Sequence, residues 1–201
     1  SVLHILSRLI LLSAGSHRLS AQYALESFTF DTDIYSIREC CIPGFHYKYD
    51  DYLQYAPAAL TIGLKAGGYD SRSSWGRMLV SDAFSAVIMT GAVNGLKYSV
   101  QRPRPDGSRN NSFPSGHTAT AFMTATMLHK EYGWRSPWFS IGGYTAAAIT
   151  GVSRIMNKKH WMTDIMAGAA IGIGSVHLGY FLTDRTVKDR GLDPCFSYAS
   201  L

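Results

Sequence analysis

The chain has 201 residues, which is enough for one domain with a buried core. Only 16% of its residues are charged, against a usual quarter, and its formal net charge is +5. This basic balance favours a phosphorylated substrate or an anionic lipid, and we expect no nucleic-acid partner because the aromatic residues do not interleave with a basic stripe.

Two segments precede the apolar part of the chain. Residues 1–21 are interpreted as the remnant of a secretory signal peptide, because the apolar run Leu9–Leu12 precedes Leu19-Ser20-Ala21, a tolerable cleavage site. A short amphipathic helix is the alternative. Residues 22–51 are polar and aromatic, and we expect them to form an irregular lead-in.

Five apolar segments follow, and the Gly and Pro residues between them are typical of helix boundaries. Few runs alternate with period two, so strands are not expected. The segments predict helices at about 52–65, 75–98, 115–132, 138–154 and 161–182. We therefore predict an all-α fold: an antiparallel bundle of about five core helices within residues 52–184, with its active site at one end and a tail at 185–201.

Short connections favour antiparallel neighbours, which brings three distant motifs to one end of this bundle. The second helix ends at Lys97 and the third begins at Ser115, while the fourth ends at Arg154 and the fifth begins near His160. Basic residues gather at the opposite end: Arg72, Arg77, Lys130, Arg135, Arg185, Lys188 and Arg190. In a membrane this basic end is expected to be cytoplasmic, so the motif end faces outward.

The composition leaves two environments open for these helices. The 19 glycines suit helices that pack closely in a membrane, and the second and fifth segments are long enough to cross a hydrocarbon layer of about 30 Å. The mean hydropathy of −0.02 is low for an embedded protein, so a soluble bundle with solvated charges at its base is the alternative. We favour the membrane.

The three cysteines are Cys40, Cys41 and Cys195, and their spacing does not resemble a zinc site. In an exported chain Cys195 could pair with Cys40 or Cys41, and three unpaired thiols are the alternative. The sequence does not choose between these two states.

The first motif to consider is Pro114-Ser115-Gly116-His117, at the predicted start of the third helix. Ser115 is a good N-cap, and Gly116 lets the backbone approach a ligand closely. A helix N-terminus attracts phosphate through its unpaired N–H groups, and His117 would lie beside that anion. Taken alone, the tetrapeptide is better explained as a capped helix with an incidental histidine.

The second motif comprises Ser153-Arg154, His160 and Asp164. The last two residues are four apart, so on a helix they share a face, and the carboxylate can orient the imidazole for nucleophilic attack. Arg154 can hold two phosphate oxygens with its guanidinium. For the His–Asp pair alone, a solvated surface pair is the more common explanation.

The third motif runs from Lys97 to Arg104-Pro105, through an extended, proline-rich stretch. Lys97 also suits the end of a long helix, where a cation complements the helix dipole. Spacing alone does not decide whether Arg102 or Arg104 binds a phosphate.

The three motifs complement each other at one end of the bundle. Three cations can neutralise a phosphate, a glycine-bearing turn can present N–H groups, and two histidines with one carboxylate can attack and protonate. Together they predict a phosphoryl-transfer site that needs no metal ion.

The chain resembles the type-2 phosphatidic acid phosphatase superfamily, which includes vanadium-dependent haloperoxidases and bacterial acid phosphatases. Its pattern is Lys, six residues and Arg-Pro; Pro-Ser-Gly-His; and Ser-Arg, five residues, His, three residues and Asp. Every position matches between residues 97 and 164. The resemblance implies a bacterial lipid phosphate phosphatase.

The resemblance also implies the roles of the site residues. It makes His160 the nucleophile that forms a phosphohistidine, Asp164 its orienting carboxylate, and His117 the group that protonates the leaving alcohol and then activates water. It makes phosphate ligands of Lys97, Arg104, Ser115, Gly116 and Arg154. No metal is implied, and vanadate is expected as an inhibitor.

The implied substrate is lipid A, undecaprenyl diphosphate or phosphatidylglycerophosphate, and the expected location is the bacterial inner membrane with the site facing the periplasm, or the periplasm itself. The alternatives are a vanadate-dependent haloperoxidase, in which vanadate is the cofactor, a soluble non-specific acid phosphatase, and a lipid-binding scaffold without activity. The oligomeric state is not predicted.

Overall fold

The computed structural model describes residues 29–186, which fall in two compact units divided between Pro43 and Gly44. In the first unit, residues 29–41 are helical, so the prediction of an irregular lead-in over 22–51 is wrong for this stretch. The physical reason is that no Gly or Pro interrupts residues 29–42, and Pro43 ends the stretch. The predicted signal peptide, residues 22–28, Cys195 and the end of the tail lie outside the described residues, and Cys40 and Cys41 are exposed.

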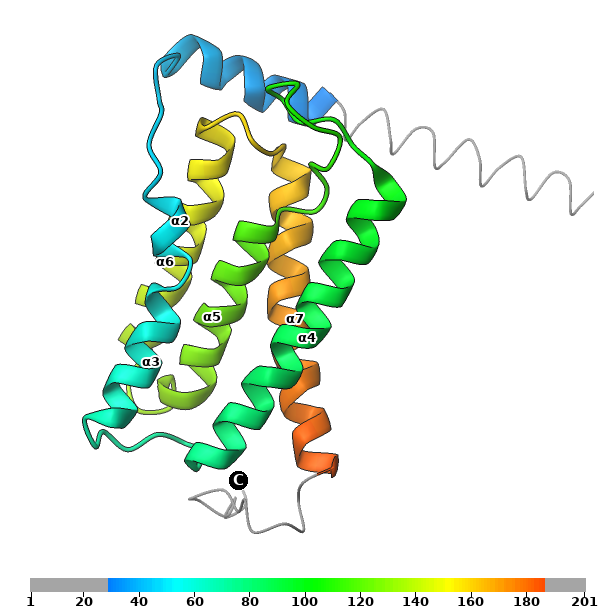
Figure 1. Cartoon of the computed structure of the whole chain (residues 1–201). Helices are drawn as coiled ribbons and strands as arrows, with labels where there is room; N and C mark the ends of the chain where they lie inside the picture. Colours follow the sequence, from blue (N-terminus) through cyan, green and yellow to red (C-terminus); the bar gives the residue numbers. More distant parts are fainter. Residues whose placement is uncertain (1–28, 187–201) are drawn as a thin grey trace, which may run out of the picture. The chain divides into compact units, whose positions relative to one another are not determined.

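The described part of the second unit is built from helices and their connections, of which the one between α4 and α5, residues 101–115, is long (Figure 1). This confirms the predicted all-α bundle. In chain order the helices are α2 (Asp50–Leu53), α3 (Ala56–Ala66), α4 (Trp75–Val100), α5 (Gly116–Tyr132), α6 (Pro137–Met156) and α7 (Met162–Thr186).

The first predicted helix is divided into α2 and α3 at Gln54 and Tyr55. Pro57 occupies one of the first two positions of α3, where its missing N–H is tolerated, and the geometry it imposes separates the two helices. The buried Gln54 anchors the junction, because its carbonyl accepts a hydrogen bond of 2.9 Å from Thr124 of α5. The short helix α2 is thereby held against the centre of the bundle.

Helix α5 is the centre of the bundle and contacts α2, α3, α4, α6 and α7. One buried face contributes Ala119, Met123 and Met127 to a cluster with α4 and α7, and another contributes Ala121 and Ala125 to a cluster with α6. Because α5 is buried on most sides, its two ends are its points of access. Its N-terminal end carries the Pro-Ser-Gly-His motif.

Glycines of α7 allow unusually close contact with its neighbours, as the small-residue composition predicted. A Cβ atom on Gly172 would lie 2.4 Å from the Ala119 carbonyl oxygen of α5, and one on Gly179 would lie 2.3 Å from the Ser85 hydroxyl of α4. Both distances are far inside van der Waals contact. The backbone of α7 therefore fixes the positions of α4 and α5 around it.

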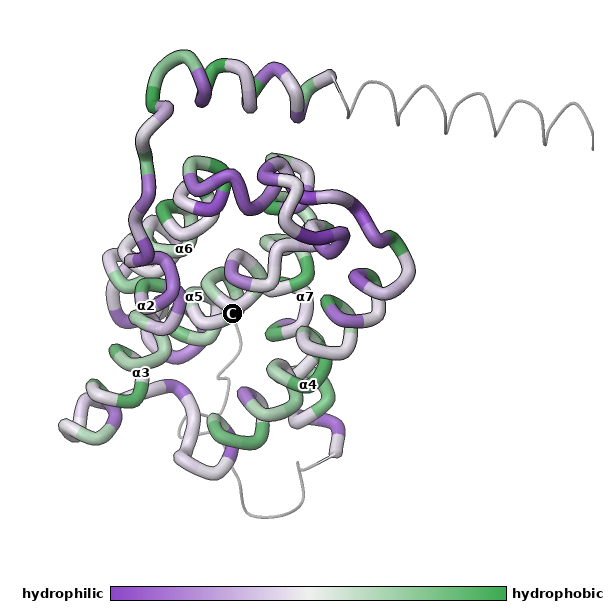
Figure 2. The backbone as a smooth tube through the Cα atoms, turned by 45° about the horizontal axis from the view of Figure 1, so that its top comes forward, coloured by the Kyte–Doolittle hydropathy of each residue, from purple (hydrophilic) through white to green (hydrophobic). Residues whose placement is uncertain are grey.

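Among the helices of residues 29–186, α4 and α7 are long and apolar enough to cross a membrane. Within their most apolar windows only 22% and 39% of the residues are buried, whereas the core helix of a soluble bundle would be mostly buried. Large apolar side chains such as Val87 and Phe181 face outward. Figure 2 shows hydrophobic residues along the helices and a hydrophilic connection after α4.

The end of α4, the start of α5, the end of α6 and the start of α7 lie at the same end of the bundle (Figure 1). The three motifs are therefore brought together as the antiparallel arrangement predicted. The starts of α4 and α6 and the ends of α5 and α7 lie at the opposite end.

Candidate active site

The connection before α7 holds His160, which is buried and 2% exposed. The histidine precedes the helix, since α7 begins at Met162, so the expectation that His160 and Asp164 share a helical face is wrong. The reason is that the Asp164 carboxylate turns back to accept a hydrogen bond of 2.9 Å from the Trp161 N–H, as in a capping box. This cap starts the helix after His160.

The Nδ1 atom of His160 lies 2.8 Å from the Ser112 carbonyl oxygen. A carbonyl oxygen can only accept a hydrogen bond, so Nδ1 carries the proton and the lone pair of the neutral ring is on Nε2. Burial lowers the pKa of His160 below its ordinary 6.5, and the charges of Arg154 and Arg104 act in the same direction, against Asp164. The site therefore favours a neutral imidazole whose Nε2 can act as a nucleophile.

The Asp164 carboxylate is fully buried and organises the surroundings of His160. It accepts a hydrogen bond from the Ser112 hydroxyl and forms an ion pair of 3.0 Å with Arg102. Its nearer oxygen lies 3.7 Å from His160 Nδ1, which is beyond hydrogen-bonding distance. Asp164 thus positions the imidazole largely by fixing Ser112, while its charge acts on the ring through space.

The two arginines that the sequence could not separate differ in their partners. Arg102 binds Asp164 and Thr163, at 3.0 and 2.6 Å. Arg104 donates to the side chain of Asn111 at 3.1 Å, and burial together with the charge of Arg154 lowers its pKa. Arg102 is thereby engaged in supporting Asp164, and Arg104 lies among the cations near His160.

Arg154, near the end of α6, is buried with a side chain only 11% exposed. One terminal nitrogen forms an ion pair of 2.7 Å with Asp50 of α2, and the same nitrogen lies 3.8 Å from Asp51. Its Nε–H is buried without a hydrogen-bond partner among the described residues. A buried guanidinium N–H without an acceptor is costly, and an anionic ligand would satisfy it.

The start of α5 matches the predicted N-cap. Ser115 is buried, and its hydroxyl accepts from the Thr118 N–H and lies 2.9 Å from the Thr118 hydroxyl. This hydroxyl is therefore committed to the cap, and its predicted contact with phosphate stays a prediction. A Cβ atom on Gly116 would lie 3.8 Å from Lys97 Nζ, which is ordinary van der Waals contact, so the lysine ammonium lies directly beside the start of α5.

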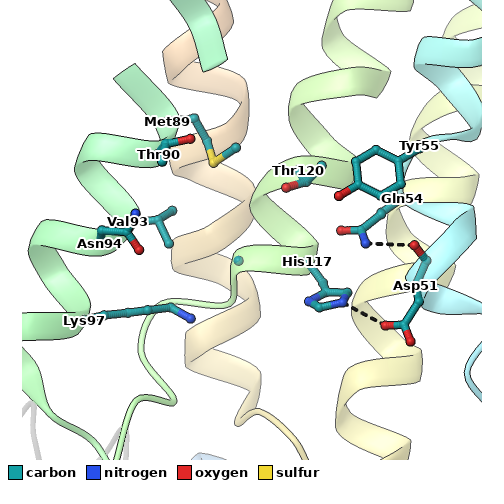
Figure 3. Close-up of a pocket in the computed structure, with 11 residues that line it drawn as sticks. Asp51, Gln54, Tyr55, Met89, Thr90, Val93, Asn94, Lys97, His117 and Thr120 are labelled. Atoms are coloured by element: carbon teal, nitrogen blue, oxygen red, sulfur yellow. Dashed lines mark hydrogen bonds and ion pairs between the residues drawn. The ribbon is translucent and has the colours of Figure 1, made fainter. Parts of the chain in front are cut away.

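His117 faces an open cavity of about 490 Å³ that is lined by α2, the junction between α2 and α3, α4 and α5 (Figure 3). Its Nε2 lies 2.9 Å from Asp51 of α2, while Lys97 of α4 reaches toward the ring from the other side (Figure 3). Lys97 is within electrostatic reach of both Arg104 and Arg154. The cavity continues away from these cations between polar side chains: Gln54, Tyr55, Thr90, Asn94 and Thr120.

The residues that support the site were not predicted from the sequence. Asp50 and Asp51 lay in the segment read as irregular, and Ser112 lay between two motifs without any pattern of its own. Asn157 positions Asp50, since its side chain bonds Tyr47 in both directions and reaches Asp50 at 3.5 Å. The only sequence feature that marks these residues is the consecutive pair Asp50-Asp51, and no neighbouring residue or spacing links this pair to Arg154.

One group in the described part of the chain brings metal-ligand atoms together: Asp50, Asp51 and His117 lie within 4.8 Å of one another. Asp50 is already paired with Arg154, and Asp51 is already paired with His117. A divalent cation at this position would compete with the arginine and the histidine for the same oxygens. The carboxylates therefore fit better as partners of the two side chains than as metal ligands.

Comparison with known proteins supports the family resemblance. Residues 78–187 match the sequence model of the PAP2 superfamily. A lipid A 1-phosphatase from Porphyromonas gingivalis is 48% identical over 167 residues, which are 83% of this chain and 38% of that protein. A phosphatidylglycerophosphatase B from Bacillus subtilis is 28% identical over 130 residues, which are 58% of this chain and 62% of that protein. This chain thus spans about two fifths of the length of the Porphyromonas protein.

Two solved structures share the fold. The crystal structure of Aquifex aeolicus LpxE superposes with a TM-score of 0.54 at 23% identity, covering 72% of this chain and 92% of that one. A transmembrane PAP2-type phosphatidylglycerolphosphate phosphatase from Bacillus subtilis has the same TM-score at 19% identity, covering 85% of this chain and 98% of that one. The family match extends over more than half of the sequence and includes the three motifs, so the chain belongs to the PAP2 superfamily.

Proposed function

We propose that the protein is a metal-independent phosphatase that hydrolyses lipid phosphomonoesters or diphosphates through a phosphohistidine at His160. The observation that carries this proposal is that the same site contains a neutral, buried His160 and a buried Arg154 whose Nε–H has no hydrogen-bond acceptor among the described residues. The first supplies a nucleophile whose tautomer is fixed. The second supplies a buried donor that lacks an acceptor until an anion binds.

The reaction has two steps. In the first, the Nε2 lone pair of His160 attacks phosphorus, the bond from phosphorus to the leaving oxygen breaks, and His117 gives a proton to that oxygen. In the second, His117 takes a proton from water, whose oxygen attacks phosphorus. The bond from phosphorus to His160 Nε2 breaks, and inorganic phosphate is released. Both histidines are then restored.

The negative charge on the phosphate oxygens is stabilised by the cations around His160. Lys97, Arg104 and Arg154 would neutralise the non-bridging oxygens, and the N-terminal N–H groups of α5 at Gly116 would donate to them. Phosphoryl transfer depends mainly on alignment and charge neutralisation, and three fixed cations provide both. We propose Asp51 as the group that orients His117 during proton transfer.

The proposed substrate is a lipid phosphate, with lipid A, undecaprenyl diphosphate and phosphatidylglycerophosphate as the candidates. Support comes from the outward-facing apolar residues of α4 and α7 and from the relatives that are named as lipid phosphatases. We propose that the bundle lies in the bacterial inner membrane with its site on the periplasmic side. The basic residues at the opposite end favour this orientation.

The proposal is tested with the purified chain in detergent and a panel of the three lipid substrates and a soluble aryl phosphate. Phosphate release is measured with and without EDTA. We expect release from at least one lipid at an unchanged rate in EDTA, and loss of more than a thousandfold in His160→Ala. Loss of turnover in EDTA, or retained turnover in His160→Ala, contradicts the mechanism.

A further inference from the structure

A second cavity, of about 210 Å³, lies at the end of the bundle opposite to His160. It is lined by residues from the beginning of α4, the end of α5, the end of α7 and the connection before α4. None of the three motifs contributes to it. The proposed hydrolysis gives it no role.

The cavity gathers cations from three separate segments: Arg72 before α4, Arg77 on α4 and Lys130 on α5. Arg77 and Lys130 approach the same ring, since each lies 5.8 Å from the centroid of Tyr180. Like charges that converge in this way repel one another unless an anion lies between them. Their arrangement therefore calls for negative charge inside the cavity.

One carboxylate lines the cavity among the described residues, and it belongs to Asp184. A single oxygen of Asp184 accepts from Arg77 at 2.6 and 3.0 Å, so this carboxylate is directed at one of the cations. Lys130 has no hydrogen bond or ion pair within residues 29–186, although it faces the Tyr180 ring. Because the Asp184 carboxylate is already paired with Arg77, it leaves the positive charge of Lys130 without a partner of its own in the cavity.

The nearby buried acids do not supply the missing charge to the cavity. Asp82 and Glu131 lie behind Tyr180, whose hydroxyl is 3.2 and 3.0 Å from them. Glu131 also accepts from the Ser73 N–H at 2.9 Å. The hydrogen bonds of the Tyr180 hydroxyl fix the position of the ring that Arg77 and Lys130 contact.

We propose that this cavity binds the phosphate group of an anionic lipid headgroup. The oxygens of a phosphate group match the ammonium of Lys130 and the neighbouring guanidinium of Arg77. Arg77 and Asp184 lie near the ends of α4 and α7, the two candidate spans. Phe181, 51% exposed beside the cations, would contact the lipid below its headgroup. The site depends on the membrane placement of α4 and α7 and is independent of the hydrolytic mechanism.

The test is lipid binding by the full chain in detergent, followed by native mass spectrometry. The probe is phosphatidylglycerol, a phosphodiester that a phosphomonoesterase does not consume, and phosphatidylcholine is the zwitterionic comparison. We expect phosphatidylglycerol to bind, Lys130→Gln to weaken its binding about tenfold, and Lys130→Arg to restore it. Asp184→Asn, which removes the competing carboxylate, is expected to strengthen binding.

Two controls separate this cavity from other cationic surfaces. Arg135→Gln removes an exposed cation at the same end, paired with Asp70 outside the cavity, and is expected to leave binding unchanged. Lys97→Gln alters the proposed catalytic site and is also expected to leave phosphatidylglycerol binding unchanged. Equal loss in Lys130→Gln and Arg135→Gln, or loss only in Lys97→Gln, would overturn the proposal.

A further arm distinguishes a lipid headgroup from free phosphate. Inorganic phosphate is titrated against the wild-type chain and Lys130→Gln by calorimetry, in the absence of lipid. If Lys130→Gln weakens phosphate binding while neither chain binds phosphatidylglycerol, the cavity is a soluble-phosphate site and the lipid assignment is wrong.

Discussion

The tautomer of His160 is set by a single contact, its donation to the Ser112 carbonyl oxygen. Burial lowers the pKa of this imidazole, so the neutral, nucleophilic form should persist as the pH falls through 6.5. We expect the acidic limb of kcat/KM for the wild-type chain to lie below pH 6.5. Because the negative charge of Asp164 raises the His160 pKa, Asp164→Asn should move that limb to lower pH and reduce kcat.

The measurement is a pH profile of kcat/KM for both chains with one lipid substrate. Asp70→Asn, which removes an exposed carboxylate at the opposite end, serves as the control and should leave the profile unchanged. A limb that stays in place or moves to higher pH in Asp164→Asn would contradict the predicted effect of this carboxylate on the His160 pKa.

The pair of His117 and Asp51 leads to a prediction about protonation of the leaving group. Asp51 is hydrogen-bonded to the His117 ring at 2.9 Å, so Asp51→Asn should misalign the proton donor without removing it. We expect kcat for a lipid phosphate to fall about tenfold, in line with one lost charged hydrogen bond, while an aryl phosphate is affected less. An aryl oxide leaves with little help from a proton, whereas an alkoxide requires one.

The comparison of the two substrates is the decisive part of this experiment. If Asp51→Asn slows both substrates equally, Asp51 acts on binding or on Arg154, from which it lies 3.8 Å, and not on proton transfer. His117→Ala should show the same preference for the aryl substrate in a stronger form.

Helix α7 packs very closely against its neighbours, and two of its glycines provide a test position and a control for this close packing. A Cβ on Gly172 would lie 2.4 Å from a carbonyl of α5, whereas one on Gly174 would meet nothing within 4 Å. We expect Gly172→Ala to lower the free energy of unfolding by about 1–3 kcal/mol through overpacking. Gly174→Ala should be neutral or stabilising by up to about 1 kcal/mol, because Ala favours helix.

Thermal unfolding in detergent compares the two variants directly. Equal midpoints for Gly172→Ala and Gly174→Ala would mean that the close approach of α7 to α5 does not hold in solution. Loss of activity in Gly172→Ala at temperatures where it stays folded would show that this contact also aligns the catalytic groups.

Helix ends were predictable where a local sequence feature marks them. The ends of α4, α5, α6 and α7 were predicted to within a few residues, because caps such as Ser115 and breakers such as Pro137 are local features. The division between α2 and α3 was missed, although Pro57 near the start of α3 is a local signal for it. The contact of Gln54 with Thr124 of α5, which anchors the junction, cannot be read from the sequence. The helix at 29–41 was missed because its aromatic and acidic composition resembled a loop.

At the scale of the whole molecule, the motif residues were predictable and their supports were not. Lys97, His117 and His160 stand in a pattern that one sequence displays, so antiparallel topology could bring them together. The ion pair between Asp50 and Arg154 joins residues 104 positions apart, and no spacing rule links them. The partnership exists only because α2 packs on α6, which depends on the tertiary fold.

Membrane orientation is testable on the whole molecule with single cysteines in a background without Cys40, Cys41 and Cys195. Tyr98, 80% exposed at the catalytic end, and Trp134, 51% exposed at the opposite end, are the paired positions. A membrane-impermeant thiol reagent applied to the periplasmic side of intact cells should label Tyr98→Cys and leave Trp134→Cys unlabelled. Val87→Cys, on the outer face of α4, should resist labelling from both sides, and the reverse pattern at the two ends would invert the orientation.

The central claim is that His160 carries the phosphoryl group between substrate and water. The most direct measurement uses His117→Ala, in which activation of water is slowed and the intermediate should accumulate. After a single turnover with a labelled phosphate ester, the quenched protein is digested and examined by mass spectrometry. We predict an acid-labile phosphate on His160 in amounts that match the alcohol released, whereas release of alcohol with an unmodified His160, or with phosphate on another residue, would contradict the account.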